Sequence, residues 1–464
     1  MTATRPARAE RHDARSPGIS YQDLLNQDSR PENVPAVLRW ESNEPVGPDT
    51  VCRDRYTTRE FYELERERMW KRTWQMACRG EDIPNVGDTL VYDICDISIL
   101  IVRVAAHEIK AYYNACLHRG RQLKEHDANN VELRCPFHGF CWNLDGTLKQ
   151  IPCEWDFPHI NRDEWTLPEV RLGEWGGFVF VNPDPACEPL ESFLGDFPSH
   201  WTKWPLEKRY KAVHVARIFE TNWKVLQEAF MEAFHVVATH PQLLAGIGDA
   251  NSQYDWSGNF SRAITPNGTP SPHIGFEPTQ QQVFDAMSDR RLDEDPFVVL
   301  GANDTARSIA GTGGRFRMAD VLGDTAGELS DAEMADSIYY TLFPNLHPWG
   351  AYNKITYRFR PYGDRHDMAI MECMLLEPFD QSQPKPPAVP IHWLGADDDW
   401  TAAPELGLLA RVFNQDSFNL PKVQVGLSSL RKDVTLAKYQ ETKIRHFHHL
   451  LDEKLRSEDC GTAK

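Results

Sequence analysis

The spacing of apolar residues changes after Trp74, and the predicted structure changes with it. Tyr62, Leu64, Met69 and Trp70 recur at roughly helical spacing, which predicts a short amphipathic helix over residues 57–74. The residues that follow form short β-prone runs, separated by turn sequences such as Asp145-Gly146. The predicted strands are residues 89–94, 97–104, 109–115, 131–135 and 178–181. This pattern predicts an antiparallel β domain over residues 41–190, with the helical segment at its start.

The second half of the chain mixes strand-like and helix-like stretches. A proline-rich segment at 182–198 marks the boundary. The predicted strands are 211–219, 338–343, 354–361 and 368–377, and the predicted helices are 222–237, 408–415 and 436–455. We therefore predict a second domain of mixed α+β structure over residues 191–464.

Within this second domain, residues 241–335 are rich in Gly, Asn, Asp and Pro. They contain one helical patch near 280–290 and a flexible-looking stretch at 311–314. A long irregular insertion of this kind is usually functional and often forms a lid or a binding loop.

Composition and charge limit which binding partners and which cellular location can be expected. Residues 1–40 are polar and proline-rich, which predicts a disordered tail without the apolar segment of a secretory signal. No apolar run approaches the length of a membrane span, and a net charge of −18 argues against nucleic acid or an anionic membrane as a partner. Ten cysteines in 464 residues are too sparse for a disulfide scaffold, so a reducing, cytoplasmic location is expected.

Two short clusters of Cys and His carry the most specific chemistry. Cys116 and His118 are followed, after sixteen intervening residues, by Cys135 and His138. In an extended segment residues i and i+2 point the same way, and Pro and Gly around the second pair favour a turn. Each loop can then supply one thiolate and one imidazole, which is the ligand set of a Rieske [2Fe–2S] cluster. The alternative is a structural Cys₂His₂ zinc site, although zinc fingers usually place both Cys before both His.

The residues around these clusters resemble a known family. Cys116-Leu-His118-Arg-Gly and Cys135-Pro-Phe-His138-Gly-Phe-Cys-Trp are similar to the two Rieske boxes of the Rieske non-haem iron ring-hydroxylating oxygenases, large (alpha) subunit. The resemblance extends over about residues 40–455. It implies a Rieske domain that binds one [2Fe–2S] cluster, followed by a catalytic domain of the helix-grip type, an antiparallel sheet with helices, that binds one Fe(II). It also implies a homotrimer, to which small beta subunits can be added.

A second metal site is only weakly indicated by spacing. His235 and His240 are five residues apart and would differ by about 140° in direction on an ideal helix. They can share a metal only if the helix loosens between them, and two unrelated histidines are the alternative. The segment from Asn222 to His240 resembles the iron-binding helix of the family. That resemblance implies that His235 and His240 hold iron and that Glu232 bridges the iron site to a Rieske histidine of a neighbouring subunit.

The remaining site residues follow from the same resemblance. Gln415-Asp416, followed by Gln424-Val-Gly, is similar to the segment that supplies the third iron ligand, which implies that Asp416 is this ligand; a helix-surface Asp is the alternative. Phe230, Val236 and Phe413 flank the ligands and are expected to line a substrate pocket, with ordinary core as an equal alternative.

These motifs together predict an oxygenase component that uses O₂. The chain has no flavin or nicotinamide fingerprint, so a separate reductase or ferredoxin must deliver the electrons. The resemblance implies a path from His138 through Glu232 to the iron, with a small apolar or aromatic ring substrate that is hydroxylated or dihydroxylated. O- or N-demethylation on the same fold is the first alternative. A Rieske electron carrier without oxygenase activity is the second, but it needs no large second domain.

Overall fold

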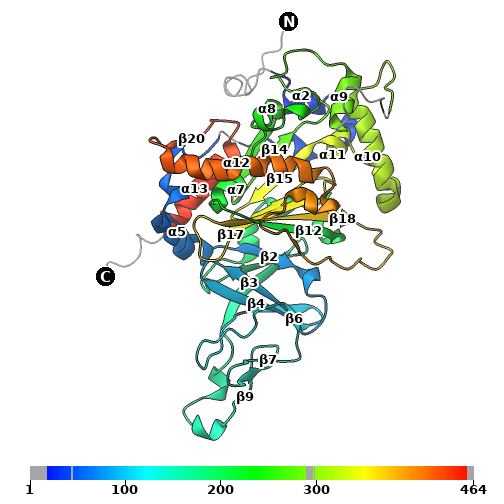
Figure 1. Ribbon diagram of the computed structural model, residues 1–464. Coiled ribbons are helices and arrows are strands. Elements are labelled where there is room, and N and C mark those ends of the chain that lie inside the picture. Colours follow the sequence, from blue (N-terminus) through cyan, green and yellow to red (C-terminus); the bar gives the residue numbers. More distant parts are fainter. Residues whose placement is uncertain (1–17, 43–44, 289–295, 297, 457–464) are drawn as a thin grey trace.

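The computed structural model describes residues 18–42, 45–288, 296 and 298–456, and it has two parts (Figure 1). A β domain forms one end, and a larger sheet with helices forms the other end. The secondary structure confirms the predicted α+β class with an antiparallel β domain first.

The first domain is built on a seven-stranded antiparallel sheet in the order β2-β11-β10-β5-β4-β3-β6. Its strands are β2 (Gln75–Arg79), β3 (Asp88–Ile94), β4 (Ile97–Ala105), β5 (Glu108–Tyr113), β6 (Ala128–Asn129), β10 (Glu169–Trp175) and β11 (Phe178–Asn182). Ile99 to Val102 of β4 are fully buried, because this central strand is covered on both faces. A small sheet of β7 (Leu133–Arg134), β8 (Cys141–Trp142) and β9 (Leu148–Gln150) lies at the tip far from the second domain (Figure 1).

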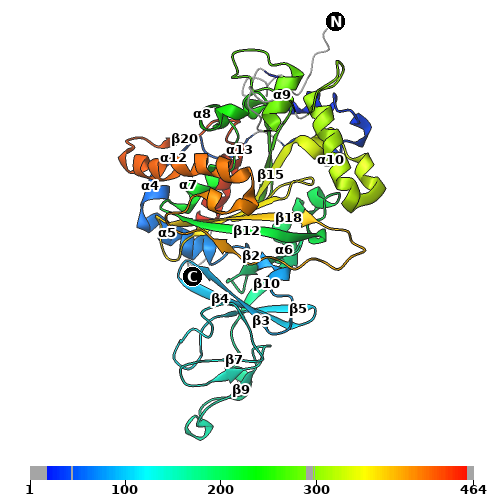
Figure 2. The ribbon, with the colours of Figure 1, turned by 45° about the vertical axis from the view of Figure 1, so that its right-hand side comes forward.

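The second domain contains an eight-stranded sheet in the order β13-β14-β15-β16-β17-β18-β12-β19. Its strands are β12 (Arg209–Phe219), β13 (Gln253–Ser257), β14 (Phe260–Thr265), β15 (Ser337–Leu342), β16 (Leu346–Pro348), β17 (Ile355–Pro361), β18 (Ala369–Pro378) and β19 (His392–Trp393). All pairings are antiparallel except that of β12 with β19. The helices α7 (Trp223–Glu228), α12 (Leu409–Ser429) and α13 (Thr442–Arg456) lie on one side of this sheet, and the β domain lies on the other (Figures 1 and 2).

The insertion is more regular than the sequence predicted. It contains the helices α9 (Gln280–Met287), α10 (Ala306–Leu322) and α11 (Asp331–Ala335), and residues 311–314 lie inside α10. The expectation of a flexible glycine stretch is therefore wrong, and packing gives the reason. A Cβ at Gly311 would lie 2.0 Å from Asp331 Oδ1, and one at Gly314 would lie 2.8 Å from Met334 Cβ. The glycines thus let α10 approach α11 closely.

The N-terminal residues also differ from the prediction of a disordered tail. Residues 18–40 are ordered, with α2 (Tyr21–Leu25), a 3₁₀ turn (Pro31–Asn33) and α3 (Ala36–Arg39), while residues 1–17 lie outside the described residues. Tyr21, Leu25 and Leu38 are buried in a core that also contains Tyr340 of β15. Burial of these few apolar residues in a core shared by both domains anchors the polar segment.

The helix expected at 57–74 is divided into α4 (Asp54–Thr57), α5 (Arg59–Glu65) and a π-helical turn (Arg66–Trp70). The sequence predicted a helix at the start of the first domain, but these three pieces also pack against the second domain. Glu65 forms a fully buried ion pair with Lys224 at 2.7 Å, and the Trp70 and Trp223 ring centroids are 5.0 Å apart.

Candidate metal centres and the adjoining cavity

Two similar turns hold the four residues predicted to bind the [2Fe–2S] cluster: Cys116 and His118 lie in one turn, and Cys135 and His138 lie in the other. In each turn the Cys N–H donates to the carbonyl of the residue five positions later, at 2.8 Å, and a Gly N–H donates back to the Cys carbonyl, at 2.8 Å in the first turn and 3.1 Å in the second. Gly120 and Gly139 adopt φ values of 75° and 80°, a backbone conformation that favours glycine. The two boxes therefore fold locally into matching loops.

The structure brings the four predicted cluster ligands together. The Cys116 and Cys135 side chains are buried and within hydrogen-bonding reach of each other, and the His118 and His138 ring centroids lie 4.6 Å apart. Burial raises the pKa of the Cys116 thiol to about 11, so a nearby cation is needed to hold a thiolate at neutral pH. His118 Nδ1 is buried without a hydrogen-bond partner among the described residues. Two buried thiols and an unpartnered imidazole nitrogen fit a [2Fe–2S] cluster.

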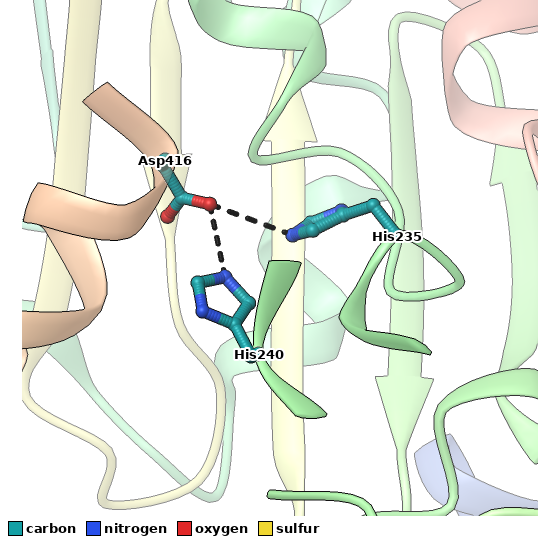
Figure 3. Close-up of side chains that lie close together, drawn as sticks. All are labelled: His235, His240 and Asp416. Carbon is teal, nitrogen blue, oxygen red and sulfur yellow. Dashed lines mark hydrogen bonds and ion pairs between the residues drawn. The ribbon is translucent and has the colours of Figure 1, made fainter. Parts of the chain in front are cut away.

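The second site lies where a helix is interrupted. The helix expected over 222–237 is two short helices, α7 and α8 (Val236–Thr239), and residues 229–235 between them form turns. His235 precedes α8 and His240 follows it, with φ −128° and ψ 52°. His240 thus lies just beyond the end of α8 and outside helical geometry, which frees its side chain from the direction that a continuous helix would impose. Both imidazoles face Asp416 (Figure 3).

Asp416 completes a group of three metal-binding side chains (Figure 3). It lies on α12 and is buried, so it is not a helix-surface residue. Its Oδ1 atom lies 2.9 Å from His240 Nε2 and 3.6 Å from His235 Nε2, and the potential ligand atoms all lie within 4.8 Å of one another. Two imidazoles and one carboxylate on one side of a site are the ligand set of non-haem Fe(II) oxygenases.

Two further side chains orient the imidazoles. His235 Nδ1 lies 2.5 Å from Glu232 Oε1, and the His235 backbone N–H donates to Glu232 Oε2 at 3.1 Å. His240 Nδ1 lies 2.7 Å from Gln415 Oε1. With Nδ1 engaged by these acceptors, both Nε2 atoms are directed towards Asp416. Sequence reasoning missed Gln415, although its position next to Asp416 could have indicated a positioning role.

The charge around His235 suits a cation. Burial by itself would lower the pKa of His235, but the carboxylates of Glu232 and Asp416 outweigh burial and raise this pKa to about 9. A site that holds a proton so firmly between carboxylates also favours a divalent metal, which must displace that proton to bind.

A cavity of about 150 Å³ adjoins the three potential ligands. Phe230, Val236 and Phe413 all line it, as do Tyr339, Trp349 and Tyr357. The Tyr339 and Trp349 ring centroids lie 5.3 Å apart, and those of Trp349 and Tyr357 lie 6.2 Å apart. Sequence reasoning missed the last three residues, because they lie on or between strands far along the chain from the histidines. Only the pairing of β15, β16 and β17 places them beside the ligands.

The two sites lie in different parts of the chain. The cluster loops belong to the tip of the first domain, and the His235, His240 and Asp416 group lies on the opposite side of the large sheet (Figures 1 and 2). Within the described residues, none of the helices combines the length and apolar character that crossing a bilayer requires.

The fold and these donor sets define a two-domain metalloprotein with a Rieske-type site and a His₂-carboxylate site. Residues 73–161 match the Rieske [2Fe-2S] domain, and residues 202–457 match the ring hydroxylating alpha subunit (catalytic domain). The second match covers more than half of the chain, so the chain belongs to the ring-hydroxylating alpha subunits of Rieske non-haem iron oxygenases.

The relatives include both dioxygenases and monooxygenases. The chain is similar to the anthranilate 1,2-dioxygenase large subunit of Acinetobacter baylyi, with 32% identity over 202 residues, or 41% of this chain and 42% of that protein. It is also similar to the carnitine monooxygenase oxygenase subunit of Escherichia coli K12, with 33% identity over 196 residues, or 40% and 50%. The chain thus spans about half the length of the curated relatives it matches.

Solved structures show the same fold. A quaternary ammonium Rieske monooxygenase in complex with L-carnitine has a TM-score of 0.62 at 16% identity, covering 89% of this chain and 97% of that one. A naphthalene 1,2-dioxygenase bound to phenanthrene has a TM-score of 0.63 at 16% identity, covering 90% and 94%.

Proposed function

We propose that this chain is the oxygenase component of a multicomponent system that uses O₂ and electrons from a separate reductase or ferredoxin. The observation that carries the proposal is the group of His235, His240 and Asp416, which borders an aromatic cavity. Bound iron supplies O₂ activation there, and a [2Fe–2S] cluster supplies single electrons. The protein's own part is to hold the metals, to orient the substrate and to exclude water.

We propose one cluster and one Fe(II) per chain. Cys116, His118, Cys135 and His138 would hold the cluster, and His235, His240 and Asp416 would hold the iron. Analysis of freshly purified protein should give about three iron atoms and about two acid-labile sulfides per chain. About two iron atoms would instead indicate a Rieske electron carrier, and stoichiometric zinc without sulfide would indicate a structural metal site.

The electron path is proposed to cross between subunits. His138 is exposed in the second cluster loop, and Glu232 contacts His235. The small sheet of the cluster loops lies at the tip of the β domain, and α7 and α8 lie beyond the large sheet (Figure 1). A head-to-tail homotrimer is therefore proposed to bring His138 of one chain to Glu232 of the next. A native mass measurement separates a homotrimer from an assembly with small beta subunits. A strictly monomeric and fully active protein would contradict the intersubunit path.

The proposed substrate is a small aromatic or apolar ring compound, which undergoes hydroxylation or dihydroxylation. The aromatic and aliphatic lining of the cavity, including Phe230, Val236 and Phe413, supports this proposal. The reaction can be run under ¹⁸O₂ with a surrogate reductase and the product analysed by mass spectrometry. Two ¹⁸O atoms in the product would identify dihydroxylation.

A second candidate is oxidative removal of an alkyl group, such as O- or N-demethylation. Tyr339, Trp349 and Tyr357 present three neighbouring π-systems, which suit a substituted ammonium group through cation–π attraction. The carnitine and glycine betaine monooxygenase subunits among the relatives support this candidate. Incorporation of one oxygen atom with release of an aldehyde would favour it.

A reducing, cytoplasmic location is proposed as well. All cysteines among the described residues are free thiols, and a thiolate-held cluster is most stable in a reducing compartment.

A further inference from the structure

A second cavity adjoins the aromatic one. It has a volume of about 600 Å³ and lies between the η8 turn (Pro241–Leu243), α9, α10 and α11. Leu243 and Ile247 line both cavities, so the two spaces meet at these side chains. Figures 1 and 2 show α9 near α8, and α10 next to α9. The aromatic cavity alone is about the size that holds one benzene ring, so a larger substrate needs further space, and this second cavity offers it.

The second cavity, here called the distal chamber, differs in chemistry from the first. Phe284, Met287, Ile309 and Met334 make most of its wall apolar, and Arg317 is the only charged residue among its lining residues. Arg317 is exposed on α10, and no carboxylate among the described residues pairs with it. An unpaired guanidinium at the edge of an apolar chamber is suited to bind a carboxylate.

We propose that the aromatic cavity and the distal chamber form one elongated substrate site. The reacting group lies beside His235, His240 and Asp416, an apolar chain passes between Leu243 and Ile247, and a terminal carboxylate pairs with Arg317. The site therefore selects an elongated apolar molecule with an acid at the end remote from the reaction. This inference rests on the proposed oxygenase function, but it concerns binding and is tested without turnover.

Gly313 provides a variant that fills the distal chamber without disturbing the fold. It lines the chamber inside α10, and an added Cβ would meet only Arg317 Nη1, at an ordinary 3.5 Å. Its neighbours Gly311 and Gly314 are different, because a Cβ at either position would collide with α11. Leu also favours a helix more than Gly does, so Gly313→Leu should fold. Ala319→Leu, at an exposed position of the same helix, is the matched control.

The experiment is calorimetric titration of oxidised, metal-loaded protein without reductant. The probes are phenylacetate, phenylbutanoate, phenylhexanoate and phenyloctanoate, the alcohol corresponding to each acid, and benzyl alcohol as a probe confined to the aromatic cavity. In the wild type, affinity should peak at one chain length among the acids. Gly313→Leu should weaken that acid by about tenfold or more and leave benzyl alcohol unchanged. Arg317→Gln should weaken the same acid by about three- to fivefold and leave its alcohol unchanged.

In the wild type, the inference would be overturned if no long acid bound, or if the affinity for the acids did not depend on chain length. In the variants, it would be overturned if the best acid bound wild type and Gly313→Leu equally, or if Arg317→Gln lost equal affinity for that acid and its alcohol. Failure of the oxygenase function would look different. The long acids would then bind as described, but the fully reduced system would consume no O₂ with any ring substrate.

Discussion

The two metal centres of this chain are built in opposite ways. The cluster loops are local: Cys116 and His118 lie in one hydrogen-bonded turn, and Cys135 and His138 lie in a matching turn. The iron site is assembled over a long range, because His240 meets Asp416 across 176 positions of sequence. A local site depends mainly on the short-range turns of its own residues, whereas an assembled site depends on every element that positions it. The two centres should therefore be separable by mutation.

The largest expected effect is the loss of the cluster. Cys135→Ser removes one of the two buried thiols proposed to hold the cluster, so the Rieske visible and EPR signals should fall below about a tenth of the wild-type intensity. Cys153→Ser, at an exposed position, should retain both signals. A full-intensity spectrum in Cys135→Ser would exclude this residue as a ligand.

Loss of the assembled centre should leave the local one intact. Asp416→Ala, His235→Ala or His240→Ala should remove the mononuclear iron and abolish oxygenase activity, while the cluster spectrum is unchanged. Metal analysis and O₂ uptake measure the two effects, and Asp433→Ala, an exposed acid, serves as the control. If Asp416→Ala retained full iron and turnover, another carboxylate would be the third ligand.

The link between the centres can be weakened without emptying either one. Gln keeps the size of Glu but loses its charge and one acceptor site. Glu232→Gln should therefore leave both metals loaded and the cluster reducible, yet slow cluster reoxidation by about tenfold or more. Stopped-flow mixing of reduced protein with substrate and O₂ records this rate. Reoxidation at the wild-type rate would show that Glu232 only orients His235.

The smallest expected effect comes from the residue that orients His240. Gln415→Leu removes the acceptor at 2.7 Å from His240 Nδ1 and should weaken iron binding by about tenfold, the lower end of the range for partners of metal-bound histidines. Gln415→Glu retains an acceptor oxygen and should restore much of the affinity. Iron titration by equilibrium dialysis distinguishes the two variants. Unchanged iron affinity in Gln415→Leu would mean that the backbone alone positions His240.

The N-terminal region shows where sequence reasoning reached its limit. Residues 18–40 are polar enough to predict disorder, but Tyr21, Leu25 and Leu38 enter the core beside Tyr340. The prediction of a flexible stretch at 311–314 was wrong for a similar reason, since the role of the α10 glycines depends on how closely α11 approaches. In both cases the deciding contacts come from residues hundreds of positions away or across a helix pair, where local propensity has no information.

The sequence by itself determined the α+β class and the pairing of Cys with His in two short boxes. These two features are local or rest on short motifs, so backbone preference and side-chain chemistry suffice to predict them. The residues of the iron site followed only from the family resemblance, because their spacing alone is a weak signal. Only the tertiary structure decided that the helix breaks between Glu228 and Val236, that Asp416 turns inward to meet His240, and that three aromatic residues of distant strands form the cavity wall. Those outcomes depend on long-range packing, which positions backbone segments that the sequence alone leaves unrelated.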